Sequence, residues 1–312
     1  MRIGIDIMGG DHAPEKIVQG VLLAKEEIKD KTELVLFGDK KKIENLLSIH
    51  NTNKHIFEIV HCKETISMGE NAIKGFRNKP NSSISKGFDA LKKNHIDGFA
   101  SAGNTGAMFV GGYYSVKAIE GVLRPTICSV LPKINGGKTL LLDVGANADC
   151  KADVLYQFGL LGSLYAKYIF NIKNPNVSLL NLGEEKSKGN LLTQAAYNLM
   201  EGTRDYNFIG NIESRDIFDS NTDVIVCDGF TGNIVLKQAE AIYELVKKRN
   251  IKDEYFDKFN YERYGGTPII GLNKAVVIGH GISNQLAIKN MVFLTKNIAE
   301  ARLSEKIKKH IN

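Results

Sequence analysis

Short apolar runs alternate with stretches of helical spacing along most of the chain. The first run, Ile3 to Ile7, predicts a strand, and a helix is predicted from about Pro14 to Ile28 because its apolar positions recur every three to four residues. Further strands are predicted at 34–37, at 56–60, around Phe99, and at 127–131, 140–144, 177–182, 208–212, 224–227 and 275–278. Further helices are predicted around 43–47, at 84–91, after Asn104, at 154–172, 189–200 and 234–246, and from a cap at Ser283 to Leu303. This alternation predicts a mostly parallel sheet with helices on both faces.

One pair of strands departs from the parallel pattern. Ile127 to Leu131 and Leu140 to Val144 are separated by Asn135-Gly136-Gly137, a sequence typical of a hairpin turn, so an antiparallel element is expected there. The chain has no Pro/Ser-rich linker, low-complexity tract or internal repeat. We therefore predict an α/β fold of three α/β/α layers with a mostly parallel open sheet. It is expected to form a single domain over residues 1–312, with a short helical excursion at about 234–263.

Composition narrows the class of protein. The 312 residues include 30 glycines and four cysteines, and the formal net charge is +6. That charge favours an acidic partner or an anionic surface, but no basic block is large enough to indicate nucleic-acid binding. The cysteines have no metal-ligand spacing, and Cys128 and Cys227 stand inside apolar runs, where we expect buried, reduced side chains. Met1 leads straight into a strand pattern and no apolar run approaches about 20 residues, so we expect a cytoplasmic protein without a signal peptide.

Glycine-rich polar loops follow six of the predicted strands. Each begins where its strand ends and combines glycine with Asn, Asp or Ser: Asp6–Asp11, Ser101–Gly106, Asp143–Asn147, Asn181–Gly189, Asp228–Asn233 and Gly279–Ser283. Open α/β sheets bind ligands outside the carboxyl ends of their strands. We therefore expect these loops to gather along one edge of the sheet and to form the functional site.

The second of these loops is a candidate anion site. Gly103 and Gly106 let the backbone adopt positive φ and let a ligand come close. Ser101, Asn104 and Thr105 stand where the next helix exposes free N–H groups, and such a helix start binds anions such as phosphate. The alternative is a simple helix cap, which this loop alone does not exclude.

Several familiar motifs are absent. A Walker A loop ending at Gly137-Lys138-Thr139 would need glycine at position 132, which is Pro132. The segment Gly279–Asn284 lacks the third glycine and the later acidic residue of a dinucleotide fingerprint. No dense His/Asp set indicates a metal, and no G-x-S-x-G elbow is present. We therefore expect no cofactor and no metal.

Taken in order, the loop motifs resemble those of a known family. They are Asp6-x-Met-Gly-Gly-Asp11-x-Ala-Pro14, Ser101-x-Gly-Asn-Thr-Gly-Ala107, Asp143-x-Gly-Ala-Asn147, Asn181-x-Gly-x-Glu185-x-x-Lys-Gly189, Asp228-Gly-Phe-x-Gly-Asn233 and Tyr264-Gly-Gly266. Together they resemble the PlsX family, the acyl-ACP:phosphate acyltransferases of bacterial phospholipid synthesis, from residue 3 to about residue 300. The resemblance implies an enzyme that transfers a long-chain fatty acyl group from acyl carrier protein (ACP) to inorganic phosphate. It also implies an isocitrate/isopropylmalate-dehydrogenase-like fold, a homodimer, and peripheral contact with the inner face of the membrane.

This chemistry suits a site made of N–H groups and amides. Phosphate is itself the nucleophile and a thiolate leaves easily, so the enzyme mainly has to position phosphate and stabilise an oxyanion. We expect Ser101, Asn104 and Thr105 to hold the phosphate and Lys188 to add positive charge. The remaining candidates for substrate contact are residues of the same motifs: Gly9, Gly10, Asp11, Gly103, Gly106, Gly145, Gly183, Glu185, Gly229, Gly232 and Gly266.

Amide and carboxylate side chains in the loops are expected to have different roles. Asn147, Asn181 and Asn233 are candidate donors to phosphate or to the oxyanion. Asp6, Asp143 and Asp228 are more naturally braces for the loops, because carboxylates repel phosphate and Asp often caps turns.

His280 and the segment between Asn233 and Tyr264 each allow a functional and a structural interpretation. His280 stands in the His-Gly pair that the resemblance covers, and it is a candidate proton carrier or a turn residue. Only 30 residues separate Asn233 from Tyr264, fewer than in the helical hairpin of the family, which the resemblance links to subunit and membrane contact. In this chain the segment contains the basic run Lys247-Lys248-Arg249. The run is either a solvated helix end, the interpretation that we favour, or a docking surface for acidic ACP.

Two other functions stay open from the sequence. One is a phosphate acetyltransferase-like enzyme that uses an acyl-CoA, which the length of an acyl groove would distinguish. The other is a non-catalytic scaffold that binds acyl phosphate. Incubation with palmitoyl-ACP and phosphate separates the three functions.

Overall fold

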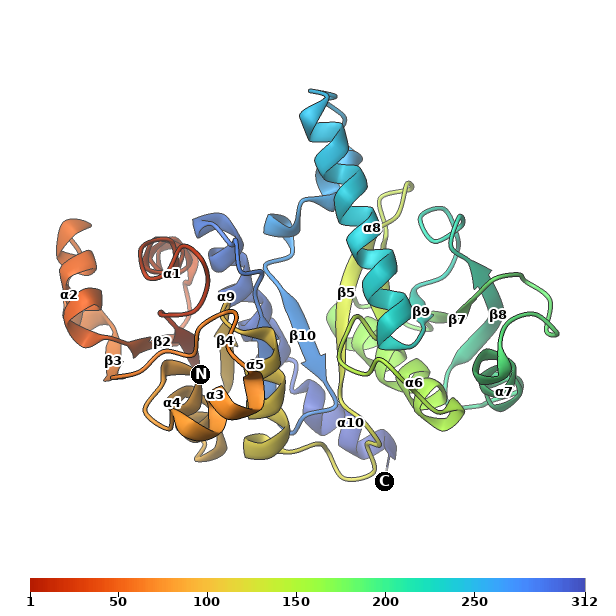
Figure 1. Cartoon of the computed structure of the whole chain (residues 1–312), viewed down its shortest axis with the longest axis horizontal. Helices are drawn as coiled ribbons and strands as arrows, with labels where there is room; N and C mark the ends of the chain where they lie inside the picture. The colour runs from red at the N-terminus through yellow and green to blue at the C-terminus, as the bar shows by residue number, and fades with distance from the viewer. Residues whose placement is uncertain (312) are drawn as a thin grey trace. The chain divides into compact units, whose positions relative to one another are not determined.

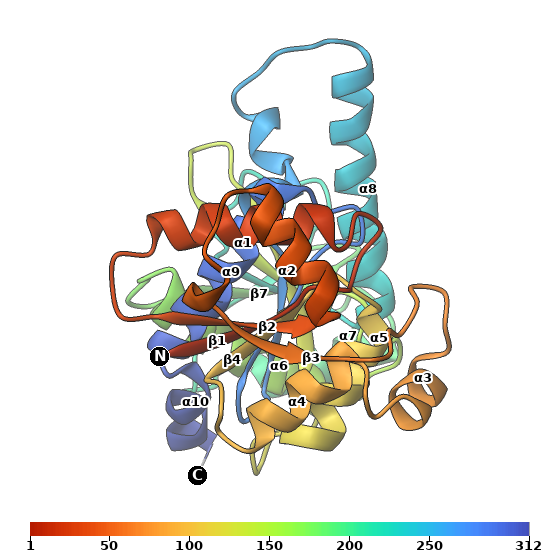
Figure 2. The same ribbon diagram turned by 90° about the vertical axis from the view of Figure 1, so that its left-hand side faces the viewer.

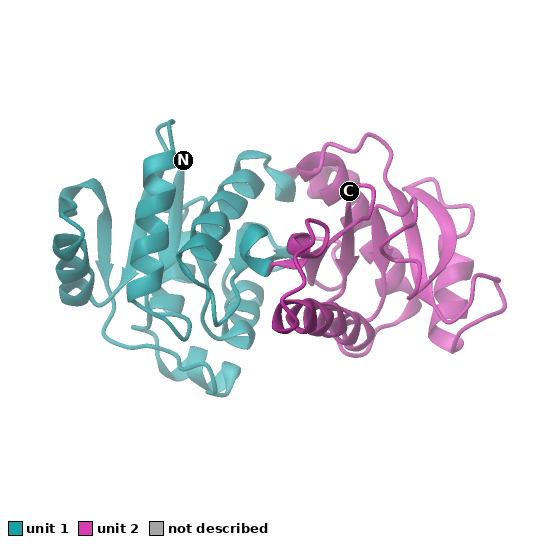
Figure 3. Cartoon of the chain, turned by 90° about the horizontal axis from the view of Figure 1, so that it is seen from above, with its two compact units in different colours: residues 1–118, 261–304 teal, residues 119–260, 305–312 magenta. Residues whose placement is uncertain are grey.

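Strands and helices alternate through most of the chain, as the hydrophobic pattern predicts (Figure 1). The structure is a computed structural model that describes residues 1–311. The chain divides into two units (Figure 3): unit 1 comprises residues 1–118 and 261–304, and unit 2 comprises residues 119–260 and 305 to the end of the chain. Helix α10 (Leu303–Ile311) begins in unit 1 and continues in unit 2.

Unit 1 is built on a mostly parallel sheet whose strands lie in the order β3-β2-β1-β4-β11-β10. These strands are β1 (Arg2–Asp6), β2 (Glu33–Gly38), β3 (Glu58–His61), β4 (Gly98–Ser101), β10 (Thr267–Ile270) and β11 (Ala275–Ile278). Its helices are α1 (Glu15–Glu27), α2 (Lys40–Ile49), α3 (Ala72–Asn78), α4 (Ser83–Lys92), α5 (Thr105–Gly111) and α9 (Gln285–Glu300). Helices α1, α2 and α9 cover one face of the sheet, and α4 and α5 cover the other (Figure 2).

The core of unit 1 lies between these layers. Phe37, Phe88 and Phe99 are at most 1% exposed. The ring of Phe99 meets those of Phe37 and Phe88 edge-on, with centroids 5.7 and 5.2 Å away. Such pairs add to the stabilisation that apolar burial provides. Because Phe99 belongs to β4, this packing fixes the strand that leads into the loop Ser101–Gly106.

Unit 2 is built on strands in the order β5-β6-β9-β7-β8. They are β5 (Thr126–Pro132), β6 (Lys138–Leu142), β7 (Asn176–Asn181), β8 (Asn207–Glu213) and β9 (Val224–Val226), and the helices are α6 (Ala152–Ile169), α7 (Leu191–Met200) and α8 (Gly229–Lys248). The antiparallel hairpin expected at 127–144 is confirmed, because β5 pairs antiparallel with β6 while the other pairs are parallel. Cys128 and Cys227 are buried, as predicted, and neither forms a disulfide in the part of the chain that the structure describes.

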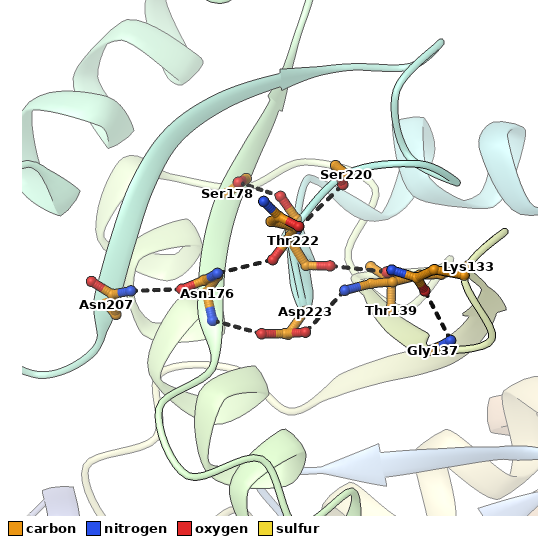
Figure 4. Close-up of polar contacts among 11 residues, drawn as sticks. Lys133, Gly137, Thr139, Asn176, Ser178, Asn207, Ser220, Thr222 and Asp223 are labelled. Atoms are coloured by element: carbon orange, nitrogen blue, oxygen red, sulfur yellow. Dashed lines mark hydrogen bonds and ion pairs between the residues drawn. The ribbon is translucent and has the colours of Figure 1, made fainter.

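A polar network lies at the edge of the unit 2 sheet where β6, β7, β8 and β9 begin and β5 ends (Figure 4). The ammonium group of Lys133 lies 3.0 Å from Asp223 Oδ1, and their side chains are only 7% and 16% exposed. Asp223 Oδ2 accepts a hydrogen bond from the backbone N–H of Asn176, whose side-chain oxygen accepts one from Asn207 Nδ2 at 2.7 Å. A buried charge needs such partners, because removal of either one leaves the other uncompensated.

Three elements differ from the sequence-based prediction. Strand β10 and helix α3 were not predicted; Pro268 inside β10 removes a backbone donor, and proline argues against a strand. The last predicted helix is in fact two helices, since α9 ends at Glu300 and Arg302 has a φ of 51°. The prediction that Ser283 caps the first of these helices is also wrong, because Asn284 Oδ1 accepts hydrogen bonds from the N–H groups of Leu286 and Ala287.

Among residues 1–311, no helix combines the length and the apolar character that crossing a membrane requires.

The packing of α1 on α9 predicts that Gly20 tolerates no side chain. A Cβ at this position would lie 2.5 Å from Ile288 Cβ and 2.6 Å from the Gln285 carbonyl oxygen. Gly20→Ala is therefore expected to lower the free energy of unfolding by about 1–3 kcal/mol, even though alanine favours helix. Urea denaturation measures this change. Gly69→Ala is the matched control, because nothing lies within 4 Å of its Cβ, and it should change stability by less than about 0.5 kcal/mol. Equal stability of the two variants would contradict this packing.

Candidate active site

Three glycine loops of unit 1 contact one another. They follow β1, β4 and β11, which are neighbours in the sheet. The Asp11 N–H donates to the Gly281 carbonyl at 2.8 Å, and the Gly279 N–H donates to the Ser101 carbonyl at 2.8 Å. These bonds link all three loops, which we call the unit 1 loops. They hold the following predicted site residues: Asp6, Gly9, Gly10, Asp11, Ser101, Gly103, Asn104, Thr105, Gly106 and His280.

Asp6 and Ser101 form the centre of the unit 1 loops. The Ser101 hydroxyl donates to Asp6 Oδ2 at 2.6 Å and accepts from the Gly103 N–H at 2.9 Å. Gly9 approaches this pair so closely that a Cβ would lie 2.4 Å from Asp6 Oδ2. Burial raises the pKa of the Asp6 carboxyl above its ordinary value of 3.8, and hydrogen bonds from Ser101 and Met8 offset only part of that rise. Such contacts are what a bracing role requires.

The side chain of Asn104 holds a neighbouring segment of the chain. Its Oδ1 accepts the Ala107 N–H and caps α5, while its Nδ2 donates to the carbonyls of Ser67, Met68 and Glu70 at 2.8–3.0 Å. The amide group is therefore engaged within the protein. Thr105, by contrast, is exposed, and neither its N–H nor that of Gly106 has an acceptor among residues 1–311.

Three loops of unit 2, which we call the unit 2 loops, follow the neighbouring strands β6, β9 and β7. The Gly229 N–H donates to the Asn147 carbonyl at 2.8 Å, and a Cβ on Gly232 would lie 2.0 Å from the Asp143 carbonyl oxygen. The loop after β6 and the loop after β9 are therefore packed backbone on backbone. The predicted site residues of these loops are Asp143, Gly145, Asn147, Asn181, Gly183, Glu185, Lys188, Asp228, Gly229, Gly232 and Asn233.

Asp143 braces its own loop. Its carboxylate accepts hydrogen bonds from the N–H groups of Ile127, Ala146 and Asn147 and from Asn147 Nδ2. Burial nevertheless raises the pKa of Asp143 above its ordinary value. Asp228 has a simpler role, because it caps α8 by accepting from the N–H and hydroxyl of Thr231 at 2.8 Å.

The candidate donors of unit 2 differ in availability. Asn147 Nδ2 donates to the Pro125 carbonyl and to Asp143, and Asn181 Nδ2 donates to the Lys188 carbonyl and to Asn211. Asn233, in contrast, is exposed next to Gly145, and its side chain has no hydrogen bond among the described residues. Lys188 is exposed too, and its ammonium group forms no ion pair in that part of the chain.

The other predicted residues lie in distinct settings. The His280 Nδ1 accepts from the Ile282 N–H, and its ring centroid lies 5.1 Å from that of Tyr261. Gly266 precedes β10, where a Cβ would lie 2.5 Å from the Ile278 carbonyl oxygen, so close strand packing explains this glycine. Lys247, Lys248 and Arg249 are exposed at the end of α8.

The chain is similar to known proteins over nearly its whole length. The family model described as fatty acid synthesis protein matches residues 1–306. The phosphate acyltransferase of Halothermothrix orenii is 41% identical over 332 residues, with 100% of this chain and 99% of that protein covered. The phosphate acyltransferase of Staphylococcus aureus strain Newman is 38% identical, with 100% and 98% covered. The chain belongs to the PlsX family of fatty acid synthesis proteins.

Solved structures place the PlsX chain in a broader fold class. A phosphotransacetylase from Streptococcus pyogenes matches with a TM-score of 0.67 at 19% identity, covering 96% of this chain and 94% of its own. A branched-chain phosphotransacylase from Enterococcus faecalis V583 matches with a TM-score of 0.64 at 12% identity, covering 96% and 99%. At such identity the likeness concerns the fold alone. It confirms the expected three-layer α/β/α, isocitrate-dehydrogenase-like fold with a mostly parallel sheet.

Two features of the candidate site were missed from the sequence. Residues Ser67 to Glu70 lie against Asn104, and their position after β3 followed the same strand-then-loop rule that revealed the other loops. Ser283 is 1% exposed, and its hydroxyl has no hydrogen-bond partner among residues 1–311. Ser283 and Asn284 are both residue types that cap helices, so the sequence did not indicate which of them caps α9 and which is buried.

The buried carboxyl of Asp6 predicts a pH dependence with a definite sign. Because its pKa is raised in the folded protein, the unfolded state releases this proton first, and stability decreases as pH rises above about 3.8. The unfolding free energy of the native protein minus that of Asp6→Asn should therefore decrease from about pH 4 upward. Urea titrations across this range measure the difference.

Asp30 provides a control of opposite sign. A hydrogen bond from Lys296 is the main cause that lowers the pKa of the exposed Asp30 carboxyl. The unfolding free energy of the native protein minus that of Asp30→Asn should therefore increase as pH rises toward about 4 and then stay level. A difference for Asp6→Asn that increases with pH would show that this carboxylate is not destabilised by burial.

Proposed function

We propose that this chain transfers a long-chain fatty acyl group from acyl-ACP to inorganic phosphate and so forms acyl phosphate for phospholipid synthesis. The observation that carries the proposal is the full-length similarity to proteins named phosphate acyltransferase, in a chain whose six glycine-rich loops follow the carboxyl ends of strands. Membership of the PlsX family makes the chain an acyltransferase.

The reaction needs few reactive side chains. A phosphate oxygen attacks the thioester carbonyl carbon and forms a C–O bond, and the electrons of the C=O bond move onto its oxygen. When the carbonyl is restored, the C–S bond breaks and the thiolate of ACP leaves. Phosphate supplies the nucleophile, so the protein has to position the two substrates. It also has to stabilise negative charge on the phosphate oxygens and on the oxygen of the former thioester carbonyl.

The proposed roles follow the availability of donors. Thr105 and the N–H groups of Thr105 and Gly106 bind the phosphate, within a loop that Ser101 and Asn104 hold in place. Lys188 and Asn233 supply charge and a hydrogen-bond donor to the reacting oxygens. Asp6, Asp143 and Asp228 fix the loops and stay away from the anion, because a carboxylate beside phosphate would repel it.

The proposal extends to the partners of the enzyme. Lys247, Lys248 and Arg249 form an exposed basic end of α8, and ACP is acidic, so electrostatic attraction would guide docking there. The same helix exposes the apolar side chains of Ile234, Ile242 and Leu245. Exposed apolar groups of this kind support the homodimer and the peripheral membrane contact that the family resemblance implies, in a cytoplasmic enzyme.

Incubation of the full chain with palmitoyl-ACP and inorganic phosphate tests the function. Long-chain acyl phosphate, trapped with hydroxylamine, and an equal amount of free ACP thiol are expected. Acyl phosphate from acetyl-CoA but not from palmitoyl-ACP would contradict the long-chain assignment. The absence of product from either donor would contradict the enzyme assignment.

Lys188 is predicted to contribute to turnover without contributing to stability. Lys188→Ala should lower kcat/KM for phosphate by about 100-fold, the usual effect of losing one oxyanion donor, at an unchanged Tm. Lys186→Ala is a matched control two residues away, because Lys186 pairs with Glu201 and stacks on Tyr197. Its activity should stay within about twofold of the native protein. Equal activity of the two variants would remove Lys188 from the site.

A further inference from the structure

A polar cavity lies in unit 2 where β7 and β8 begin. Its volume is about 310 Å³, and residues at the end of α6, in the segments before β7 and β8, and His310 of α10 line it. The unit 2 loops follow the opposite, carboxyl ends of the same sheet. We propose that this cavity binds a small phosphorylated sugar or polyol, independently of the acyl transfer proposed above.

Positive charge surrounds the cavity. Lys167, Lys173 and Arg204 line it, and none of them forms an ion pair among residues 1–311. Among the described residues that line the cavity, Asp205 has the only carboxylate, so three positive charges and one negative charge leave +2. Like charges around one cavity repel each other, and a dianion such as a phosphate monoester removes that repulsion.

A mostly buried serine lines the same cavity. Ser163 lines it, is 7% exposed, and its side chain has no hydrogen-bond partner in the described part of the chain. The Ser163 hydroxyl is not among the fully buried unpartnered atoms of residues 1–311, so it is accessible from the cavity and can donate a hydrogen bond to a ligand there. A phosphoryl oxygen accepts such a bond.

The walls of the cavity are held rigidly. Asn207 lines it and donates through Nδ2 to Asn176, which belongs to the network of Asp223 and Lys133 (Figure 4). Tyr206, another lining residue, is 7% exposed and donates from its hydroxyl to the Tyr156 carbonyl at 3.1 Å. A site on such a frame needs little rearrangement to bind a ligand.

Asp205 and the size of the cavity indicate more than a bare phosphate ion. A site of about 310 Å³ is at the lower end of the range for small-molecule pockets and has room beyond one phosphoryl group. The Asp205 carboxylate, which accepts the Tyr156 hydroxyl through Oδ2, repels free phosphate but accepts hydrogen bonds from sugar hydroxyls. A phosphate ester that carries hydroxyl groups satisfies both kinds of lining residue.

Isothermal titration of the full chain with ribose 5-phosphate, inorganic phosphate and ribose tests the site. Ribose 5-phosphate is expected to bind saturably and at least about tenfold more tightly than phosphate, and ribose should not bind. The double variant Lys173→Gln/Arg204→Gln should weaken ribose 5-phosphate binding at least about tenfold. Arg215→Gln/Lys252→Gln, which changes the net charge equally at exposed positions of unit 2, should leave it unchanged.

Asp205→Asn separates recognition of the sugar from recognition of the phosphoryl group. The variant should reduce the preference for ribose 5-phosphate over phosphate at least about threefold, because a hydroxyl acceptor is weakened and a repulsive charge is removed. Far-UV circular dichroism checks folding, and Lys167→Gln replaces the double variant if that one unfolds. No saturable binding of ribose 5-phosphate, or binding that the lysine and arginine variants leave unchanged, would overturn the proposal. Acyl transfer to phosphate would be unaffected by that result.

Discussion

The hydrogen bond from the Ser101 hydroxyl to the Asp6 carboxylate is the constraint on which the unit 1 loops depend. Both side chains are at most 1% exposed, and they join the ends of two neighbouring strands. An ionised carboxylate in that environment costs free energy unless donors surround it. The Met8 N–H of the loop after β1 and the Ser101 hydroxyl at the end of β4 are donors to Asp6, and the Gly103 N–H of the next loop donates to Ser101. The hydrogen bonds that the buried Asp6 carboxylate requires therefore determine the conformation of the unit 1 loops.

Unit 2 uses the same physical device at a different strand. Asp143 stands at the end of β6 and accepts four hydrogen bonds, three from backbone N–H groups of Ile127, Ala146 and Asn147 and one from the Asn147 side chain. In both units the buried carboxylate bonds to its own loop, and the proposed roles give the contacts with the anion to neutral and cationic donors. This division matters for an enzyme whose substrate is an anion, since a carboxylate at the surface of the site would repel it.

Much of the fold could be predicted because its signals are local. Apolar runs such as 275–278 stand between polar loops, and the strand β11 has those bounds. The glycine motifs were visible because close backbone contacts, as at Gly9 and Gly232, require that residue type. What could not be predicted depends on tertiary contacts. Strand β10 contains Pro268 and pairs with β11, and Asn284 replaces its neighbour Ser283 as a cap only through the geometry of the turn.

The roles of individual polar residues were the hardest to predict. Asn104, Asn147, Asn181 and Asn233 look alike in the motifs, and only the structure shows that the first three amides bond within the protein while Asn233 is exposed. A sequence records which residue types follow a strand, but it does not record which acceptors those side chains meet. Segments such as Ser67 to Glu70, which Asn104 brings to the site from more than 30 positions away, depend on that information.

Amide hydrogen exchange of the full chain, with and without inorganic phosphate, tests most directly whether loops braced by buried carboxylates bind the anion through their N–H groups. The amides of Thr105 and Gly106 should exchange more slowly in phosphate, while those of the remote helix α2 should not change. Exchange that phosphate leaves unaltered in the glycine loops, at concentrations that saturate turnover, would contradict the central claim.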